Sequence, residues 1–194
     1  IPPRRLHPTT WGFICPAESP EGASIGIVKN LSYMTHITIP SNSEILYELI
    51  IPLIKEIKDS NDVELYNNVK IFINGAWIGI SNNPEILYKK FKQMKANGII
   101  NIYCSIIFNY TLKEIRICND AGRMCRPVLK VDQNKLLLNK KIIENLSNNK
   151  IMWNDLLINN NNNDCVIEYI DSYEQNNSMI CMYPEDLTKE DKFI

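Results

Sequence analysis

The stretch from Arg4 to Leu31 constrains the fold of this chain more than any other part of the sequence. Three prolines and three glycines interrupt it, and a histidine, a tryptophan and a cysteine stand among them. Proline fixes φ and removes a backbone donor, whereas glycine opens conformations that other residues avoid. Such a stretch forms neither a long helix nor an uninterrupted strand. We predict a rigid, buried loop with a structural task.

Two carboxylates of this loop, Glu18 and Glu21, stand on either side of Pro20. Their spacing of three residues suggests an acid–base pair or a metal site, but a loop constrained by proline does not guarantee that they share a face. No other carboxylate lies near them in the sequence. The alternative is that one of them accepts backbone N–H bonds and holds the loop shut. Both interpretations stay open at this point.

The loop begins with the pair Arg4 and Arg5, and an arginine fork binds a phosphate or a carboxylate equally well. His7 precedes a proline and is most simply a hydrogen-bonded loop histidine, not a catalytic one. We therefore predict a loop-structural role for four residues: His7, Glu18, Pro20 and Gly22.

The composition is that of an ordinary globular protein, with 45% hydrophobic and 22% charged residues among 194. The net charge of −1 argues against an independent nucleic-acid binder, which would carry a broad basic face. The six cysteines form no CxxC pair, so we expect free thiols and no zinc site. No apolar run approaches the roughly 18 residues of a membrane span, so we expect no membrane partner and an intracellular protein.

The rest of the chain predicts an α+β fold rich in hairpins. The clearest signal is Asn74-Gly75 between two apolar runs, because this dipeptide supplies the two positive φ values of a type I′ turn. A second signal is Pro52, which should kink or split a helix over residues 44–59. The other predicted elements are a loop at 61–68, a helix at 84–97 ending at Gly98, a hairpin of 102–108 with 112–117, a strand at 128–131, short helices at 140–146 and 153–158, a loop at 159–164, and a hairpin of 166–171 with 179–182.

Three further groups of side chains are predicted from local pattern. The lysines of the 84–97 helix (Lys89, Lys90, Lys92 and Lys95) stand opposite its apolar stripe, and we interpret them as a solvated face in preference to a phosphate site. Asp120 and Arg123 should form an ion pair across a turn, with Arg126 nearby. The three tryptophans at 11, 77 and 153 are flanked by apolar residues and are expected in the core, not stacked on bases.

The loop carries a longer pattern, HPTxWGxxCPAESPEGxxxGxVKNL, which resembles the fork-region motif of the second-largest subunit of multisubunit DNA-dependent RNA polymerases. The resemblance continues in the family's order through FINGAWIG, KEIRICNDAGRMCRPVL, VIEYID and ICMYPEDL. The sequences of these motifs resemble those of the eukaryotic, archaeal and large-DNA-virus members more than those of the bacterial ones. The chain departs from the family's pattern at Thr10, where a second histidine is usual, and at Ser19, which replaces a threonine.

The resemblance implies a segment of a larger multidomain subunit. Residues 1–41 would end the fork domain, residues 42–150 would form the first external domain, and residues 151–194 would begin a mostly β second external domain. By the same resemblance the loop faces the active centre near the RNA 3′ end. Arg4 and Glu21 match the motif's arginine and second glutamate, so they carry a positioning role, with Arg5 as a weaker candidate.

The resemblance also implies a reaction and partners for the parent enzyme, which transcribes DNA into RNA from ribonucleoside triphosphates. Its catalytic Mg²⁺ is bound by the largest subunit, and its zinc ligands lie outside this segment, so we expect no catalytic or metal residue here. The implied partners are the largest subunit, other polymerase subunits, the DNA template and the nascent RNA. The compartment would be a nucleus, an archaeal cytoplasm, or a viral factory or virion. The alternative function is a non-catalytic α+β interaction module.

Overall fold

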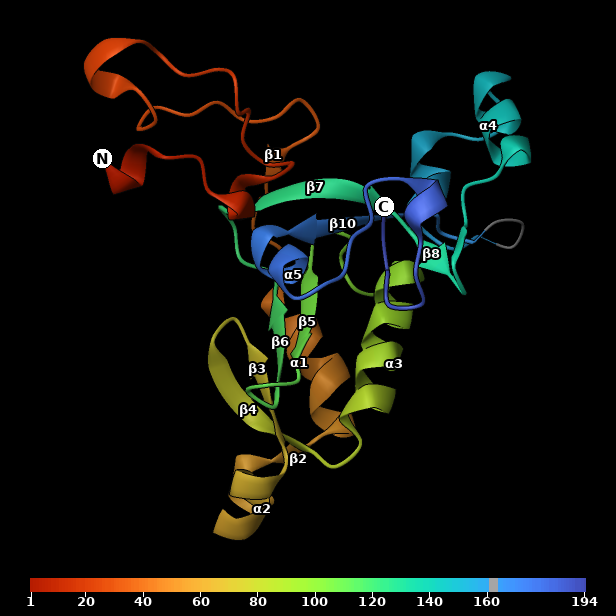
Figure 1. Ribbon diagram of the computed structural model, residues 1–194. Coiled ribbons are helices and arrows are strands. Elements are labelled where there is room, and N and C mark those ends of the chain that lie inside the picture. The colour runs from red at the N-terminus through yellow and green to blue at the C-terminus, as the bar shows by residue number, and fades with distance from the viewer. Residues whose placement is uncertain (161–163) are drawn as a thin grey trace.

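The computed structural model describes residues 1–160 and 164–194, and it confirms the α+β class. Two sheets stand one above the other in Figure 1, a mixed sheet of order β2-β4-β3-β6-β5 below and a smaller sheet of order β1-β7-β10 above. The strands are β1 (His36–Ile37), β2 (Lys55–Glu56), β3 (Val69–Ile73), β4 (Ala76–Ser81), β5 (Ser105–Asn109), β6 (Glu114–Cys118), β7 (Met124–Leu129), the small pair β8 (Val131–Asp132) and β9 (Lys135–Leu136), and β10 (Ile167–Asp171).

The helices are short except for one. The α-helices are α1 (Ser43–Ile50), α2 (Asp62–Asn67), α3 (Pro84–Ala96), α4 (Lys140–Ser147) and α5 (Ser172–Asn176). Single 3-10 turns are η1 (Pro2–Arg4), η2 (Pro8–Thr10), η3 (Gly22–Ser24), η4 (Ile51–Leu53), η5 (Ile57–Asp59), η6 (Trp153–Leu156) and η7 (Pro184–Asp186). No helix in the described ranges is long and apolar enough to cross a membrane.

The hairpin at Asn74-Gly75 is confirmed. Asn74 has φ 48° and Gly75 has φ 84°, and β3 and β4 pair antiparallel on either side of them. Both residues therefore occupy the region that a type I′ turn requires. The hairpin of β5 and β6 is also confirmed, although it begins at Ser105. The sequence did not indicate that β3 and β6 run parallel, which joins the two hairpins into one sheet.

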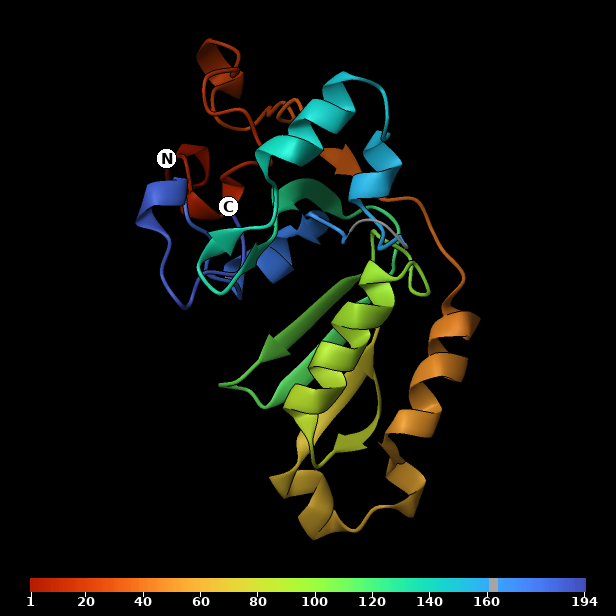
Figure 2. The same ribbon diagram turned by 90° about the vertical axis from the view of Figure 1, so that its right-hand side faces the viewer.

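The main core lies between this sheet and the helices α1 and α3, which cover one of its faces (Figure 2). The period-2 pattern of the strands delivers one apolar set to that face. The buried set comprises Leu46, Ile50, Val69, Ile71, Ile73, Leu87, Phe91, Ile100, Cys104, Ile106, Phe108, Ile115 and Ile117. Pro52 splits the helix as predicted, since α1 ends at Ile50. The chain does not resume an α-helix through residue 59, because Lys55 and Glu56 turn extended and pair with β4.

One predicted loop and one predicted hairpin are wrong. Residues 61–68 contain helix α2, because the Glu64 carboxylate accepts the Asn61 backbone N–H at 3.0 Å and caps the helix start. The last hairpin does not form either, since β10 pairs with β7. At the end of β10 the Asp171 carboxylate accepts the Glu174 N–H at 2.7 Å, and this N-cap turns the chain into α5.

The other short predictions fare better. Helix α4 is confirmed, and residues 153–156 form a single 3-10 turn within the predicted 153–158 helix. The strand predicted at 128–131 begins earlier, at Met124, and includes Pro127. Proline fits there because β1 reaches only residues 124 and 125, which leaves one side of β7 unpaired at Pro127. The predicted loop at 159–164 lies partly outside the described residues.

The N-terminal segment is not buried, contrary to the prediction. Of residues 1–31 only Phe13 is buried, and the segment extends away from the two sheets, in red and orange at the top of Figure 1. Hydrogen bonds within its own turns satisfy many of its backbone N–H and C=O groups. The segment therefore keeps its conformation without being covered by other elements. Trp11 is 61% exposed and Trp153 is 40% exposed, which makes the core prediction wrong for both. Trp77 is half-buried and stacks on Phe72.

Candidate functional site

The side chain of Arg4 holds the N-terminal loop closed. Its guanidinium donates to the backbone oxygen of Ala23 at 2.5 Å and to that of Ile25 at 3.1 Å. The two backbones also approach closely here, because a Cβ on Gly26 would lie 2.2 Å from the Arg4 oxygen. Gly26 has φ +71°, so glycine is required for two reasons. Arg4 therefore ties the start of the loop to the turn that follows Glu21.

The other predicted loop residues hold local turns. The His7 ring nitrogen Nδ1 accepts the Thr9 backbone N–H at 3.3 Å and caps the turn η2. The Glu18 backbone oxygen accepts from the Asn30 side chain at 3.2 Å. Gly22 follows with φ +83°, a conformation that favours glycine.

Glu21 and Arg5 are among the charged side chains of the loop that stay exposed. Neither makes an ion pair or a side-chain hydrogen bond within residues 1–160 and 164–194, and the same holds for the Glu18 carboxylate. Arg4 and Glu21 are not paired with one another in that part of the chain. Arg4 and Glu21, which belong to the same motif, therefore differ in the structure. Arg4 folds the loop, and Glu21 is exposed.

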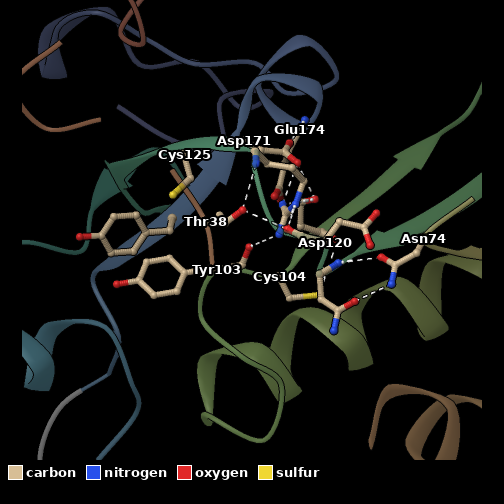
Figure 3. A network of polar contacts seen from close by, with 12 residues as sticks. Thr38, Asn74, Tyr103, Cys104, Asp120, Cys125, Asp171 and Glu174 are labelled. Atoms are coloured by element: carbon tan, nitrogen blue, oxygen red, sulfur yellow. Dashed lines mark hydrogen bonds and ion pairs between the residues drawn. The ribbon is translucent and has the colours of Figure 1, made fainter. Parts of the chain in front are cut away.

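The segment that follows the loop is fastened to the turn after β6. Thr38 donates its hydroxyl to the Asp120 backbone oxygen at 3.0 Å and accepts the Arg123 N–H at 3.0 Å. The Asn119 side chain accepts from Asn74 at 2.6 Å and donates to the Ser41 hydroxyl at 2.9 Å. Thr38, Asp120 and Asn74 are labelled in the view of this network in Figure 3. The sequence around Asn119–Arg123 is therefore a clamp on the chain that leads out of the loop.

Arg123 does not form the predicted ion pair with Asp120. Its Nε donates to the Asp120 backbone oxygen at 3.0 Å, while its other end pairs with Asp171 at 3.0 Å. Ser105 completes the group by donating to the same Asp171 oxygen at 2.7 Å. The turn presents a carbonyl to Arg123, and the buried carboxylate of β10 attracts the guanidinium more strongly than an exposed one.

Helix α3 carries the second correction, because its lysines do not all face solvent. Lys92 pairs with both Glu168 and Glu174, and Lys95 lies 3.2 Å from Glu168. Lys95 is 3% exposed and also donates to the Tyr169 backbone oxygen at 2.8 Å. We call Lys92, Lys95, Glu168 and Glu174 the buried charge cluster. It joins α3 to β10 and α5.

The two carboxylates of this cluster have opposite pKa shifts. Burial disfavours the charge of Glu168, but Lys92 and Lys95 outweigh burial and lower its pKa to about 2. For Glu174 burial is the stronger effect and raises the pKa, although Lys92 opposes it. One oxygen of Glu174, Oε2, has no hydrogen-bond partner among the described residues. The pKa of Lys92 is raised, because the two glutamates outweigh its burial.

A cysteine and a histidine also meet in the structure. Cys125 Sγ lies 3.0 Å from His36 Nε2, a contact that spans 89 residues of sequence. Burial raises the pKa of the Cys125 thiol to about 11 and lowers the pKa of His36. Both shifts favour neutral partners, and a thiol nucleophile needs the thiolate. The pair is structural, and all six cysteines are free thiols.

Three family models match the chain in the order of the domains they describe. RNA polymerase Rpb2 domain 3 matches residues 1–37, domain 4 matches residues 71–132 and domain 5 matches residues 153–193. The chain belongs to the family of second-largest RNA polymerase subunits. The resemblance seen in the sequence is thereby confirmed. The exposed loop falls in the Rpb2 domain 3 match, and the clamp turn at Asn119–Arg123 falls in the domain 4 match.

Curated relatives extend over nearly the whole chain. It is 39% identical to the DNA-directed RNA polymerase II subunit RPB2 of Encephalitozoon cuniculi over 98% of its length. It is 34% identical to the DNA-directed RNA polymerase subunit 2 of Acanthamoeba polyphaga mimivirus over 94%, and 32% identical to subunit Rpo2 of Sulfolobus acidocaldarius over 96%. The chain spans only 15–17% of the length of these relatives.

Sequence reasoning missed the residues that fasten the Rpb2-like segments together. Glu168 and Glu174 were not singled out, although charged residues beside an apolar strand are a signal for buried ion pairs. Helical spacing places the lysines in solvent, because it does not tell which side of a helix a second sheet will cover. The predicted domain boundaries near residues 41 and 150 stay predictions.

Proposed function

We propose that this chain is a working part of the second-largest catalytic subunit of a DNA-directed RNA polymerase, which transcribes DNA into RNA from ribonucleoside triphosphates. The observation that carries the proposal is the ordered match to three consecutive Rpb2 domains. The relatives' names place them in multisubunit polymerases from eukaryotes, an archaeon and a virus. The proposed partners are accordingly the largest subunit, other polymerase subunits, the DNA template and the nascent RNA.

The proposed task of this segment is to shape the fork near the RNA 3′ end. Arg4 supports it by holding the loop closed through backbone contacts. Glu21 and Arg5 support it because their charges remain exposed for an external partner. A carboxylate at a proline-fixed turn can hold an arginine or a mobile element of a neighbouring chain in place. Glu21 would then act as a positioning residue.

Metal chemistry would come from outside the segment. Two metal ions in the parent enzyme would polarise the attacking hydroxyl and stabilise the leaving pyrophosphate. No three His, Cys, Asp or Glu side chains of the described residues gather closely enough to hold a metal. On the strength of the family resemblance, we propose that the Mg²⁺ is held by the largest subunit and that the parent subunit's zinc ligands lie elsewhere. The proposed compartment is a nucleus, an archaeal cytoplasm, or a viral factory or virion.

Glu21→Ala in the assembled polymerase tests the proposal. We expect slower or less accurate single-nucleotide addition by about 1–3 kcal/mol in activation free energy, the range for removing one partner of a charged hydrogen bond. Glu48→Ala is the matched control, because Glu48 is an exposed carboxylate in the middle of α1. Gel filtration checks that both variants assemble.

Magnesium titration separates positioning from metal binding. A positioning residue predicts that extra Mg²⁺ does not restore the Glu21→Ala enzyme. Wild-type kinetics would reduce Glu21 to a residue of the loop fold, and rescue by Mg²⁺ would show that it supports the metal instead.

A further inference from the structure

The N-terminal loop touches the rest of the molecule at the far end of the chain. Gln175 of α5 donates its amide N–H to the Trp11 backbone oxygen at 2.9 Å, across 164 residues of sequence. The amide oxygen of the same side chain accepts from Arg126 Nε at 2.7 Å. One glutamine thus joins the loop to β7. Figure 1 shows α5 beside the red turn of the N-terminal segment that corresponds to η2.

Arg126 fills the space beneath the loop. Its guanidinium lies against Gly12, where a Cβ would be 2.5 Å from Nε, and 5.8 Å from the centre of the Phe13 ring. Gly12 has φ +77°, so glycine is required there both by the backbone conformation and by the close approach of Arg126. Arg126 pairs with no carboxylate in the described part of the chain, and its burial lowers its pKa. Its hydrogen-bond partner there is the neutral amide of Gln175.

Helix α5 is itself held firmly, which makes Gln175 a fixed point. The residue before it, Glu174, belongs to the buried charge cluster and pairs with Lys92 of α3. Its backbone N–H is accepted by Asp171 at the helix start. The position of Gln175 is therefore set by α3 and β10 together.

The part of the loop that Gln175 holds also forms an apolar groove. The groove has a volume of about 620 Å³, and its apolar lining includes Leu6, Pro8, Trp11, Ile14 and Pro16. Trp11 gives its carbonyl to Gln175 while its ring stays 61% exposed. A shift of the Trp11–Phe13 backbone would therefore move the groove and the rest of the loop together.

We propose that Gln175 and Arg126 are positioning residues. They set the orientation of the N-terminal loop, and with it Glu21, relative to β7 and α5. This inference rests on the proposed function for its kinetic consequence, but the docking of the loop stands on the contacts alone. Glutamine suits the task because its amide donates to one side and accepts from the other. A hydrophobic or acidic residue can do at most one of these.

The test uses the complete subunit in the assembled polymerase with three variants. Gln175→Leu removes both bonds. Gln175→Glu keeps an acceptor for Arg126 but places a carboxylate against the Trp11 carbonyl. Asn176→Ala is the control, since Asn176 is exposed on the same helix and its side chain makes no hydrogen bond within the described residues.

Two quantities are measured for each variant: amide hydrogen exchange of residues 11–15, and kcat and KM for single-nucleotide addition. We expect exchange to rise roughly threefold to tenfold in Gln175→Leu, the factor given by the loss of the one ordinary hydrogen bond that Gln175 makes to the loop. Gln175→Glu should lie between Leu and wild type, and Asn176→Ala should match wild type. We expect kcat to fall in Gln175→Leu with KM unchanged, because nucleotide binding is not touched.

The two readouts distinguish this inference from the proposed function. Unchanged exchange in Gln175→Leu overturns the inference whatever the kinetics show. Raised exchange with normal kcat, in an enzyme that Glu21→Ala does slow, overturns the positioning role. Raised exchange with normal kinetics in both variants supports the docking of the loop by Gln175 and overturns the proposed function of the loop.

Discussion

The two carboxylates around Lys92 should respond differently to neutralisation. Glu168→Gln removes a partner from Lys92 and also the carboxylate that lies 3.2 Å from Lys95. Two buried ammonium groups are then poorly compensated. Glu174→Gln leaves Lys92 with Glu168 and removes a carboxylate whose ionisation the fold already disfavours. We predict that Glu168→Gln is much the more destabilising change.

The magnitude follows in two independent ways. Breaking a buried ion pair by removing one partner costs about 3–5 kcal/mol. The pKa of Glu168 falls from 4.5 to about 2 on folding. At about 1.4 kcal/mol per pKa unit, this shift corresponds to about 3 kcal/mol of stability at neutral pH. For Glu174→Gln we expect a change of about 1 kcal/mol or less, the net value of a hydrogen bond whose loss is offset by reduced repulsion.

The two carboxylates also change the stability of the fold in opposite directions as the pH falls. The pKa of Glu168 is lowered in the folded state, so its stabilisation is present above pH 4.5 and is lost as the pH falls toward 2. The pKa of Glu174 is raised, so its contribution is fully present below its unfolded pKa and is lost as the pH rises through the folded value. The stability gap between wild type and Glu168→Gln should therefore narrow as the pH falls from 4.5 toward 2.

Urea unfolding of the 194-residue chain at pH 7 and pH 3 measures these differences, with the exposed Glu48→Gln as control. An equal or larger loss for Glu174→Gln would refute the unequal roles of the two glutamates. A Glu168→Gln deficit of the same size at both pH values would refute the ion-pair account and leave only a packing effect.

Three further outcomes are expected. Gly75→Val should lower stability by about 1–2 kcal/mol in a thermal melt, because it forces a β-branched residue to positive φ, and an unchanged melting temperature would contradict the turn assignment. Gly26→Ala should speed proteolysis of residues 1–31 more than Gly22→Ala does, because a Cβ clashes with facing backbone only at residue 26; equal rates would argue against the close approach. Cys104 and Cys125, whose thiol pKa values burial raises to about 12 and 11, should be alkylated more slowly than the part-exposed cysteines, and fast labelling would show that these sites open.

The features that the sequence predicts well are those set by neighbouring residues. Asn74-Gly75 specifies a turn, Pro52 ends a helix, and Gly98 with φ +73° follows the end of α3, because each rests on the backbone preferences of one or two residues. The same backbone preferences locate the loop at residues 4–31. They do not predict that the loop is exposed, since proline and glycine indicate the shape of the backbone and not what packs against it.

The features that the sequence does not predict depend on partners far along the chain. Lys92 meets Glu168 across 76 residues, and nothing in the helix pattern of α3 indicates a second sheet on its lysine side. Arg123 pairs with Asp171, 48 residues away, and not with the carboxylate of the nearby Asp120. In both cases a buried carboxylate decides the outcome, because an unpaired buried charge costs far more than an exposed ion pair gains.

The strand β7 explains why the loop depends on residues at the other end of the chain. It pairs with β1, which follows the loop, through His36 and Cys125, and with β10 through Leu129 and Ile167. Strands from all three predicted pieces of the chain therefore share one small sheet, even though the sequence suggests breaks near residues 41 and 150. A sheet held by backbone hydrogen bonds orients its strands as a unit. The loop leaves this sheet at β1 and is held again at Trp11 by α5, which leaves β10, so both of its supports move with β7.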